Sequence, residues 1–253
     1  MTTIPLELVQ KLRVAQQVVV LTGAGVSAES GIPTFRAAQT GLWAQYNPAE
    51  LATPQAFQKN PRLVWEWYTW RRELVAQAKP NPAHFALVQM QKYVSQFTLI
   101  TQNVDGLHQQ AGSQSVMELH GNINRTKCFQ QEHLVASWSP TEAIPPHCPY
   151  CGGLLRPDVV WFGENIPTLV FQSAREATEQ CDMFFSIGTS SLVYPAALLP
   201  LIARQATRVE INSETTPLTS QVHFTLRGSA AQLLPALINL TWATHEPLNP
   251  IPE

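Results

Sequence analysis

The stretch VVVLTGAGVSAES (residues 18–30) places two close-set glycines directly after a run of apolar residues. A continuous apolar run is typical of a strand that is covered on both faces, as in a parallel sheet. Gly23, Gly25 and Ala28 then match the pattern G-x-G-x-x-G/A of a dinucleotide-binding turn between a strand and a helix. Backbone N–H groups at such a turn favour a phosphate charge. Taken alone, the glycines leave a tight turn without any ligand as the alternative.

Five further apolar runs predict the rest of the sheet, at residues 97–101, 115–119, 183–189, 208–212 and 223–227. Helical patterns lie between them. One pattern begins with Asn81 as a candidate N-cap and Pro82 at the first helical position, and another, at 168–180, has Thr168 as its candidate cap. This alternation predicts an α/β fold in which a Rossmann-like, doubly wound parallel sheet is covered by helices.

Two stretches break the alternation and predict a smaller inserted module. Residues 37–80 have helical patterns without strands, and residues 123–158 contain three of the four cysteines and little periodicity. We expect these two stretches to form one module that is partly helical and partly zinc-ribbon-like. The Rossmann-like domain would then comprise residues 1–36, 81–122 and 159–246, followed by a tail at 247–253.

The balance of charges excludes several classes of function. The 253 residues include 16 Lys and Arg and 18 Asp and Glu, which gives a formal net charge of −2. A chain with this charge is not expected to bind nucleic acid or an anionic membrane surface. The N-terminus lacks the layout of a signal peptide, and no apolar run reaches the roughly 18 residues of a membrane span. We therefore expect a cytoplasmic, monomeric protein with no membrane or nucleic-acid partner.

Small or polar residues follow every predicted strand. We call the segment that directly follows a strand its exit. In chain order the six exits read GAGVSAES, QNVDGLH, HGN, GTSS, NSE and GSAA. Because ligands of open α/β sheets bind at the carboxyl ends of the strands, these exits predict one shared ligand. The acidic residue that a dehydrogenase places at the end of its second strand is missing, since TFRAAQTGLWAQY follows the glycine turn. A dinucleotide is therefore expected, in a binding mode unlike that of dehydrogenases.

Six motifs occur in an order that resembles a known family. They are GAGVSAESGIPTFR (23–36), TQNVDGLHQQAG (101–112), HG (120–121), CPYCGGLLRPDVVWFGE (148–164), IGTSSLVYPAA (187–197) and VEINSE (209–214). In these motifs the chain is similar to the sirtuins, which are NAD-dependent protein-lysine deacylases and formally transferases. The resemblance implies acylated lysines of proteins as partners and NAD as a co-substrate. An acyl-lysine carbonyl oxygen attacks C1′ of the nicotinamide ribose, nicotinamide leaves, and O-acyl-ADP-ribose is released with the free lysine.

The resemblance assigns roles to residues at the strand ends. His120, in ELHGN, corresponds to the catalytic base that assists deprotonation of a ribose hydroxyl, a task that suits imidazole because its usual pKa lies near neutrality. His108 is the competing histidine, and the order of the motifs makes it structural. The expected NAD contacts are Gly23, Ala24, Gly25, Ser27, Phe35, Arg36, Gln102, Asn103, Asp105, Gly188, Thr189, Ser190, Asn212, Glu214 and Ala230.

The stretch WEWYTWRRE (residues 65–73) bears on the identity of the acyl group. Tyr68 and Arg71 are three residues apart, so on a helix both side chains lie on one face. A guanidinium can bind a carboxylate through two hydrogen bonds, and a phenol can add a third. The sirtuin branch that removes succinyl and malonyl groups has this Tyr-x-x-Arg pair, and the small Ala28 leaves room for a longer acyl chain. The resemblance thus implies a desuccinylase and demalonylase with some deacetylase activity. The alternative is an aromatic core helix with Arg71 in solvent, like Arg72.

The cysteines leave two alternatives for a metal. Sirtuins usually hold a structural zinc between two C-x-x-C pairs, and here only the second pair, Cys148 and Cys151, is intact. Cys128 begins the first pair, but Gln131 stands where its partner is expected. An imidazole is a better zinc ligand than a carboxylate, and the neighbours that could supply a fourth ligand are His133, Glu132 and His147. Otherwise the module folds without metal on its apolar residues.

Three other functions share parts of these motifs. A mono-ADP-ribosyltransferase that consumes NAD would use most of the same site, so the sequence separates it poorly from a deacylase. A non-catalytic NAD sensor or zinc-ribbon interaction module would need no base such as His120 beside the nicotinamide. A hydride-transfer dehydrogenase conflicts with the missing acidic residue.

Overall fold

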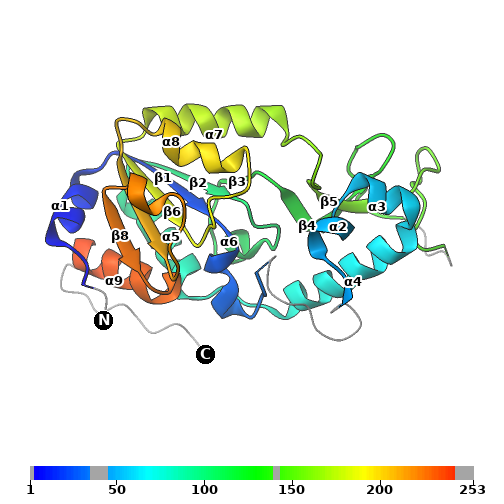
Figure 1. Cartoon of the computed structure of the whole chain (residues 1–253), viewed down its shortest axis with the longest axis horizontal. Coiled ribbons are helices and arrows are strands. Elements are labelled where there is room, and N and C mark those ends of the chain that lie inside the picture. Colours follow the sequence, from blue (N-terminus) through cyan, green and yellow to red (C-terminus); the bar gives the residue numbers. More distant parts are fainter. Residues whose placement is uncertain (1–2, 35–44, 139–142, 243–253) are drawn as a thin grey trace.

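The computed structural model describes residues 3–34, 45–138 and 143–242 and contains a six-stranded sheet (Figure 1). The strands lie in the order β3-β2-β1-β6-β7-β8, and every neighbouring pair runs parallel. They are β1 (Gln17–Thr22), β2 (Gln96–Thr101), β3 (Val116–Glu118), β6 (Met183–Ile187), β7 (Thr207–Asn212) and β8 (Phe224–Arg227). The predicted Rossmann-like α/β class is confirmed, and each of the six apolar runs supplies one of these strands.

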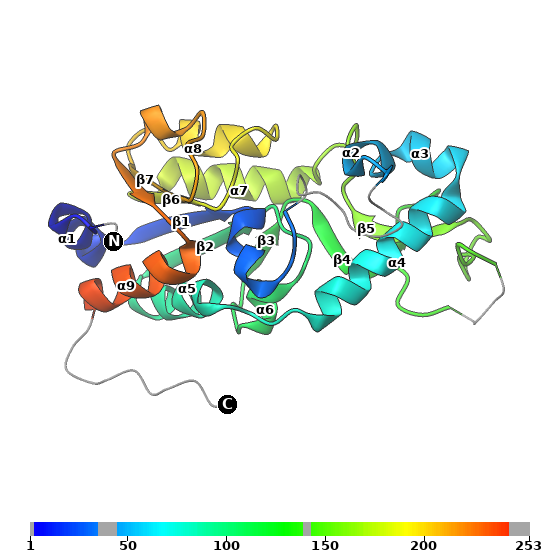
Figure 2. The same cartoon turned by 60° about the horizontal axis from the view of Figure 1, so that its bottom comes forward.

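Helices cover both faces of the sheet. One face carries α1 (Leu6–Val14), α5 (Pro82–Tyr93) and α9 (Ala230–Trp242), and the other carries α7 (Thr168–Gln180) and α8 (Leu199–Ile202) (Figure 2). Strand β1 contributes Val18 and Val20 to the first core and Val19 and Leu21 to the second. Because both of its faces are buried, this strand is apolar at successive rather than alternate positions. Within the described ranges, no helix combines the length and apolarity that crossing a membrane requires.

The two predicted helix starts have different outcomes. The side chain of Asn81 accepts a hydrogen bond from the backbone N–H two residues on (2.9 Å) and caps α5, with Pro82 at the first position as predicted. Asn81 Nδ2 also donates to the carbonyl oxygen of Val26 (2.8 Å), so the cap ties α5 to the glycine turn. The prediction that Thr168 caps α7 is wrong. Pro167 occupies the N-cap position, so Thr168 lies inside the first turn and no side chain caps the helix.

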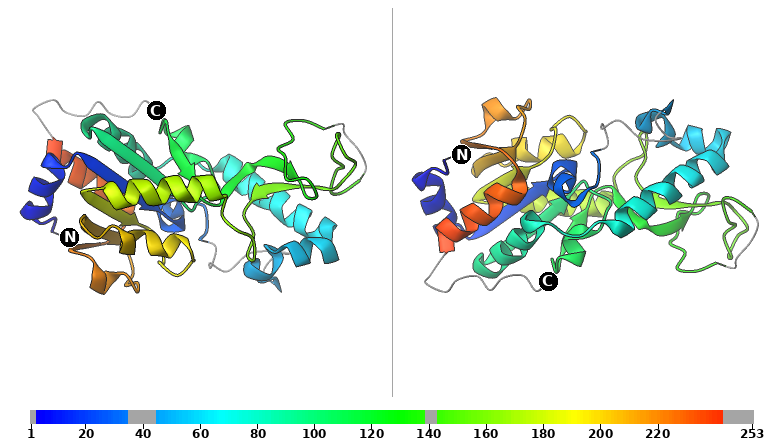
Figure 3. Two further views of the ribbon diagram at one scale, coloured as in Figure 1. Left: turned by 90° about the horizontal axis from the view of Figure 1, so that it is seen from above. Right: turned by 90° about the horizontal axis from the view of Figure 1, so that it is seen from below.

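A smaller unit of helices and a two-stranded antiparallel sheet lies at one end of the molecule (Figure 3). It contains α2 (Pro48–Leu51), α3 (Pro54–Lys59), α4 (Pro61–Gln77), β4 (Gly121–Cys128) and β5 (Leu155–Val159). Each helix starts with proline after a capping Asn or Thr. The cap side chain accepts a backbone N–H of the first turn, and proline has no N–H that would need a partner there. Phe57, Trp67 and Trp161 fill the core of the unit together with Ile123 and Val159.

Helices α2, α3 and α4 lie in the stretch where the sequence predicts helices. Strands β4 and β5 were not predicted from the sequence. Their sequences, GNINRTKC and LRPDV, carry polar or charged residues throughout. Their pairing also shifts register between Asn122 and Thr126. A shift of this kind removes the alternation of apolar and polar residues by which a half-buried strand is recognised.

The chain passes from the large sheet into the smaller unit at Gly121. This residue has a φ of 77°, and a Cβ at its position would lie 2.2 Å from the carbonyl oxygen of Asp158. A positive φ favours glycine, and the close contact leaves no room for a side chain. The turn that carries His120 therefore depends on glycine at the next position.

Gly121→Ala should destabilise the protein more than Gly31→Ala. Both glycines have a positive φ, 77° and 83°, but a Cβ at Gly31 would meet nothing within 4 Å. We expect Gly121→Ala to lower the free energy of unfolding by about 2 kcal/mol more than Gly31→Ala, because only the former forces the backbone of Asp158 to move. Urea unfolding of both variants measures the difference, and equal losses would contradict the packing argument.

Candidate active site

The carboxyl ends of β1 and β6 meet through their glycine turns. The backbone N–H of Gly23 donates to the carbonyl oxygen of Ile187 (3.0 Å), and that of Gly25 donates to the carbonyl oxygen of Gly188 (2.8 Å). A Cβ at Gly25 would lie 2.8 Å from the Cα of Gly188. The close approach of two backbones therefore requires these glycines, whether or not a ligand is bound.

The segment after the glycine turn differs from the expected helix. Residues 24–26 and 28–30 form two short 3-10 helices, and Gly31, at a φ of 83°, ends the second. The left-handed conformation of Gly31 cannot continue a helix, so the described residues 23–34 after β1 contain no regular α-helix. The start of a 3-10 turn leaves N–H groups without a partner inside the turn, and in the first turn Gly25 donates its N–H to Gly188 instead.

Three residues that are expected at the nicotinamide end, Ser27, Asn103 and Asp105, form one hydrogen-bonded cluster, which we call the cofactor cluster. Ser27 Oγ donates to Asp105 Oδ2 (2.8 Å), and Asn103 Nδ2 donates to Ser27 Oγ (3.1 Å). Asp105 is 7% exposed, and burial raises the pKa of its carboxyl, an effect that the hydrogen bonds from Leu107 and Ser27 oppose. The structure thus brings residues from the exits of β1 and β2 together.

Gln102, Thr189 and Asn212 connect three strand exits. Gln102 Nε2 donates to Thr189 Oγ1 (2.9 Å), and Asn212 Nδ2 donates to the backbone carbonyl oxygen of Thr189 (2.8 Å). The exits of β2, β6 and β7 therefore share one polar patch. Amide and hydroxyl groups are donors and acceptors of the kind that ribose hydroxyls and phosphate oxygens require.

The remaining residues expected to contact NAD are less tightly connected. Ser190 lies in the loop after β6, Glu214 is exposed in the loop after β7, and Ala230 is the first residue of α9. All three follow strand exits and so lie towards the same edge of the sheet. Phe35 and Arg36 lie outside the described residues.

His120 follows β3, and its hydrogen bond defines the tautomer of its ring. Nδ1 lies 3.0 Å from the carbonyl oxygen of Gln102. Because a carbonyl oxygen can only accept, we assign the proton to Nδ1 and the lone pair to Nε2. Burial lowers the pKa of His120 below its usual value, and the hydrogen bond to Gln102 opposes this shift only in part. The ring is therefore neutral near pH 7 and offers Nε2 as a base.

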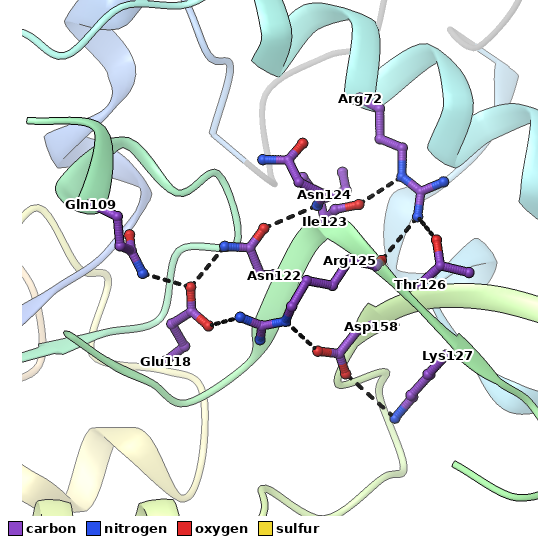
Figure 4. A network of polar contacts seen from close by, with 10 residues as sticks. All are labelled: Arg72, Gln109, Glu118, Asn122, Ile123, Asn124, Arg125, Thr126, Lys127 and Asp158. Carbon is purple, nitrogen blue, oxygen red and sulfur yellow. Dashed lines mark hydrogen bonds and ion pairs between the residues drawn. The ribbon is translucent and has the colours of Figure 1, made fainter. Parts of the chain in front are cut away.

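Glu118, two residues before His120, is not among the residues predicted from the sequence. Its carboxylate accepts hydrogen bonds from Gln109 Nε2 and Asn122 Nδ2, each at 2.7 Å, and pairs with Arg125 at 2.6 Å (Figure 4). Gln109 belongs to α6 (Leu107–Gln110), whereas the other two lie on β4. The carboxylate therefore fixes the turn of His120 from both sides. Its position beside the HG motif is the one signal that the sequence offers.

A buried histidine pair lies at the carboxyl end of β1. The rings of His84 and His108 have centroids 4.8 Å apart. His108 Nε2 lies 2.9 Å from Thr22 Oγ1, which in turn donates to Thr101 Oγ1 (2.8 Å). Burial lowers the pKa of His84 to about 4 and that of His108 to about 3. At 1% exposure, His108 is a neutral part of the core rather than a ligand-facing base.

Tyr68 and Arg71 lie on α4 beside two tryptophans. Tyr68 Oη accepts a hydrogen bond from Trp161 Nε1 (2.9 Å), and the Arg71 guanidinium lies 5.1 Å from the centroid of the Trp67 ring. Burial raises the pKa of Tyr68 to about 12, although the charge of Arg71 opposes the shift. The phenol therefore stays protonated at neutral pH and keeps an O–H to donate. Arg71 is half-buried, unlike the solvated side chain of the alternative interpretation.

The cysteine segment contains a group that can hold a metal ion. The ligand atoms of Cys128, His133 and Cys148 all lie within 4.8 Å of one another. Cys151 Sγ lies 3.4 Å from Cys128 Sγ, and His133 Nε2 lies 3.3 Å from Cys148 Sγ. Three thiols and one imidazole are a donor set that suits tetrahedral zinc. Of the three candidates for a fourth ligand, His133 is the one that belongs to this group among the described residues.

Comparisons with known proteins agree with the resemblance found in the motifs. A model of the Sir2 family matches residues 23–195. A protein of Aquifex aeolicus named NAD-dependent protein deacylase is 51% identical over 217 residues, which cover 84% of this chain and 90% of that protein. A protein of Methylococcus capsulatus with the same name is 48% identical over 242 residues, covering 92% and 95%.

Solved structures share the fold over nearly the whole chain. A crystal structure of a Sir2 homologue in complex with NAD has a TM-score of 0.89 and 44% identity, covering 95% of this chain and 94% of that one. A structure of Sir2 with a p53 peptide and NAD⁺ has a TM-score of 0.82 and 29% identity, covering 94% and 98%.

The buried histidine pair predicts a loss of stability in acid. Both rings have lower pKa values in the folded chain than the ordinary 6.5, so their contribution is complete above about pH 6.5 and is lost as the pH falls through 4 and 3. Each histidine adds a slope of about 1.4 kcal/mol per pH unit to the free energy of unfolding in this window. Urea unfolding from neutral pH down to about pH 4 measures the combined slope.

His84→Gln should remove about half of this slope, because glutamine does not bind a proton and its amide oxygen can replace the ring acceptor. His223→Gln, at an exposed position, is the matched control. An unchanged slope in His84→Gln would show that burial of this ring does not limit stability in acid.

Proposed function

Because the chain belongs to the Sir2 family and is an NAD-dependent protein deacylase, we propose that it removes succinyl and malonyl groups from lysine side chains of proteins. We expect some deacetylase activity to remain, because an acetyl group is smaller than a succinyl or malonyl group. The observation that carries the proposal is the placement of Tyr68 and Arg71 together on α4, against Trp161 and Trp67.

An acyl chain that ends in a carboxylate matches the hydrogen-bonding groups of this pair. The guanidinium of Arg71 offers parallel N–H groups that fit the two oxygens of a carboxylate. Because Trp161 donates to the Tyr68 oxygen, the phenol proton remains available for the same carboxylate. Its pKa of about 12 keeps that proton in place at neutral pH. An acetyl group has no such carboxylate and gains none of these hydrogen bonds.

Trp161, which orients Tyr68, is itself held in place by a partly buried ion pair. The Arg156 guanidinium lies 3.2 Å from the centroid of the indole ring and bonds both carboxylate oxygens of Glu164, at 2.5 and 3.0 Å. Glu164 Oε2 also accepts the backbone N–H of Trp161 (2.8 Å). These contacts leave the indole little freedom, so the phenol of Tyr68 is oriented before a ligand arrives.

The polar strand exits fit NAD, whose ribose C1′ is the electrophilic carbon when nicotinamide is the leaving group. The amide of Asn103 and the carboxylate of Asp105 would pair with the carboxamide of the nicotinamide, with Ser27 linking them. The glycine turn and Thr189 would contact the phosphates and a ribose. His120 Nε2 would accept the proton of a ribose hydroxyl, so that this oxygen can attack the acyl carbon. The lysine would then leave as an amine that takes up a proton, and a water molecule would supply the oxygen that completes the O-acyl product.

Transfer of ADP-ribose to a protein, the main alternative, is not favoured. Relatives that are 51% and 48% identical are named deacylases. The acyl-binding role that we propose for Tyr68 and Arg71 would also have no use in a transfer of ADP-ribose to an unmodified side chain.

We further propose that Cys128, His133, Cys148 and Cys151 hold a structural zinc ion. The support is the donor set, three thiols and one imidazole, and the short distances that join them in pairs. Such an ion would stabilise the loops that precede β5 and follow β4, because it ties both to one point. It would take no part in the chemistry at His120.

Arg71→Met should separate the two acyl activities. Without the guanidinium, kcat/KM for a succinyl-lysine peptide should fall about 100-fold, whereas the value for the matched acetyl-lysine peptide should change less than about threefold. Tyr68→Phe should lower the succinyl value about tenfold, because one hydrogen bond is lost. Mass spectrometry of peptides incubated with NAD follows the loss of the acyl group and would also detect any gain of ADP-ribose.

Arg62→Met is the matched control, because Arg62 is exposed at the start of the same helix and pairs with Glu66 (2.7 Å). Equal wild-type rates on the two peptides, or an unchanged preference in Arg71→Met, would contradict the acyl assignment. A gain of ADP-ribose without loss of the acyl group would favour transfer instead.

Elemental analysis should find about one zinc ion per chain in protein purified without added metal. His133→Ala should lower this content and the temperature of thermal unfolding, because one ligand is lost. His147→Ala is the control, since His147 Nδ1 already bonds the carbonyl oxygen of Gly152 (2.8 Å). Wild-type protein without zinc, unaffected by a chelator, would contradict the proposal.

A further inference from the structure

Strands β4 and β5 pair irregularly. Asn122 pairs with Asp158, but the next paired residue, Thr126, stands opposite Pro157. Residues 123–125 therefore leave the ladder and form a bulge, which we call the β4 bulge. Backbone carbonyl groups in a bulge lose their partners on the neighbouring strand and need others.

Arg72 of α4 supplies these partners. Its Nε donates to the carbonyl oxygen of Ile123 (2.6 Å), and its Nη2 donates to the carbonyl oxygen of Arg125 (3.0 Å) and to Thr126 Oγ1 (3.0 Å) (Figure 4). The rigid, planar guanidinium suits three acceptors in a fixed arrangement. The guanidinium also lies 5.4 Å from the centroid of the Trp65 ring on the same helix, which limits its movement.

The opposite side of the β4 bulge contacts the loop that carries the cofactor cluster. The backbone N–H of Ile123 donates to the carbonyl oxygen of Val104 (2.8 Å), and Asn124 Nδ2 donates to that of Asp105 (3.4 Å). The Asp105 carboxylate accepts from Ser27, as described above. One continuous series of contacts thus runs from α4 through the β4 bulge to the residues expected at the nicotinamide.

A second branch of the same network reaches the turn of His120. Arg125, in the bulge, pairs with Glu118 (2.6 Å) and donates to Asp158 Oδ2 (2.8 Å). Glu118 ends β3, two residues before His120. The bulge therefore contacts both halves of the candidate site, the loop at the nicotinamide and the turn of the base.

We propose that Arg72 is a positioning residue that fixes α4 relative to the cofactor loop at residues 103–106, and thereby couples the binding of the acyl-lysine to that of NAD. This inference rests on the proposed function, in which the neighbouring Arg71 and Tyr68 bind the acyl group. A ligand that holds α4 in place also holds the bulge, and the bulge holds the loop of Asp105 in its binding arrangement. Such a coupling acts equally on both affinities.

Arg72→Met tests this role, because it keeps the apolar stem and removes all three hydrogen bonds. The probe is a carbocyclic NAD analogue whose glycosidic bond does not break, titrated calorimetrically with and without a saturating succinyl-lysine peptide. In the wild type and in the Arg62→Met control, the peptide should tighten binding of the analogue at least about fivefold. In Arg72→Met the ratio should fall to about one, and kcat with NAD should fall at least about tenfold.

A wild-type ratio near one, or a wild-type ratio retained in Arg72→Met, would overturn the inference. If Arg72→Met does not fold, as judged by circular dichroism, Arg72→Lys replaces it. A lysine ammonium keeps the charge but cannot reach all three acceptors, so its ratio should be intermediate, and a full wild-type ratio would again overturn the role.

The same titrations with an acetyl-lysine peptide distinguish failure of the proposed acyl preference from failure of the positioning role of Arg72. If the acyl preference is wrong, the wild type deacylates both peptides equally, while the ratio measured in Arg72→Met still decides the positioning role. If the positioning role is wrong, the ratio survives in Arg72→Met, whatever the preference of the wild type.

Discussion

The register of β1 against both of its neighbours is the constraint on which the candidate site depends. Thr22, the last residue of β1, pairs with Thr101 of β2 and with Ile187 of β6. Three parallel strands therefore end at one level, and the loops that follow them have to meet. Hydrogen bonds from Thr22 to Thr101 and from Gly23 to Ile187 continue this contact beyond the sheet. The polar groups assigned to NAD stand on these exits, so the order of the strands brings distant parts of the sequence together.

A deacylase also has to bring a second substrate to the same place, and in our proposal a different unit of the chain binds that substrate. Helix α4 carries Tyr68 and Arg71, whereas the cofactor cluster and His120 belong to the ends of the large sheet. The two meet through β4, which begins at Gly121 directly after His120. The carbonyl groups of its bulge accept hydrogen bonds from α4 on one side, and the bulge contacts the loop at residues 103–106 on the other. In a regular ladder these backbone groups would bond the neighbouring strand and could not link the two units.

Features that depend on neighbouring residues could be predicted from the sequence, whereas features that depend on distant segments could not. The apolar runs reveal strands such as β1 because both faces are buried, and the cap of α5 is evident because Asn81 and Pro82 act on their own helix. The bulge of β4 has no local signal, since its partners come from α4 and the cofactor loop. Arg72 therefore reads as a solvated neighbour of Arg71 in the sequence, although it bonds three groups in the structure. The motif order indicates a sirtuin, but neither the tautomer of His120 nor the contact of His133 with the thiols follows from spacing.

The central claim is that the strand exits hold NAD with its nicotinamide ribose against the lone pair of His120 Nε2. A crystal structure of the protein with an unreactive NAD analogue and an acyl-lysine peptide tests it most directly. We expect Nε2 to lie within hydrogen-bonding distance of a ribose hydroxyl, Nδ1 to bond the Gln102 carbonyl as before, and the diphosphate to lie against the Gly23–Gly25 turn. A ribose bound away from His120, or a diphosphate bound elsewhere, would contradict it.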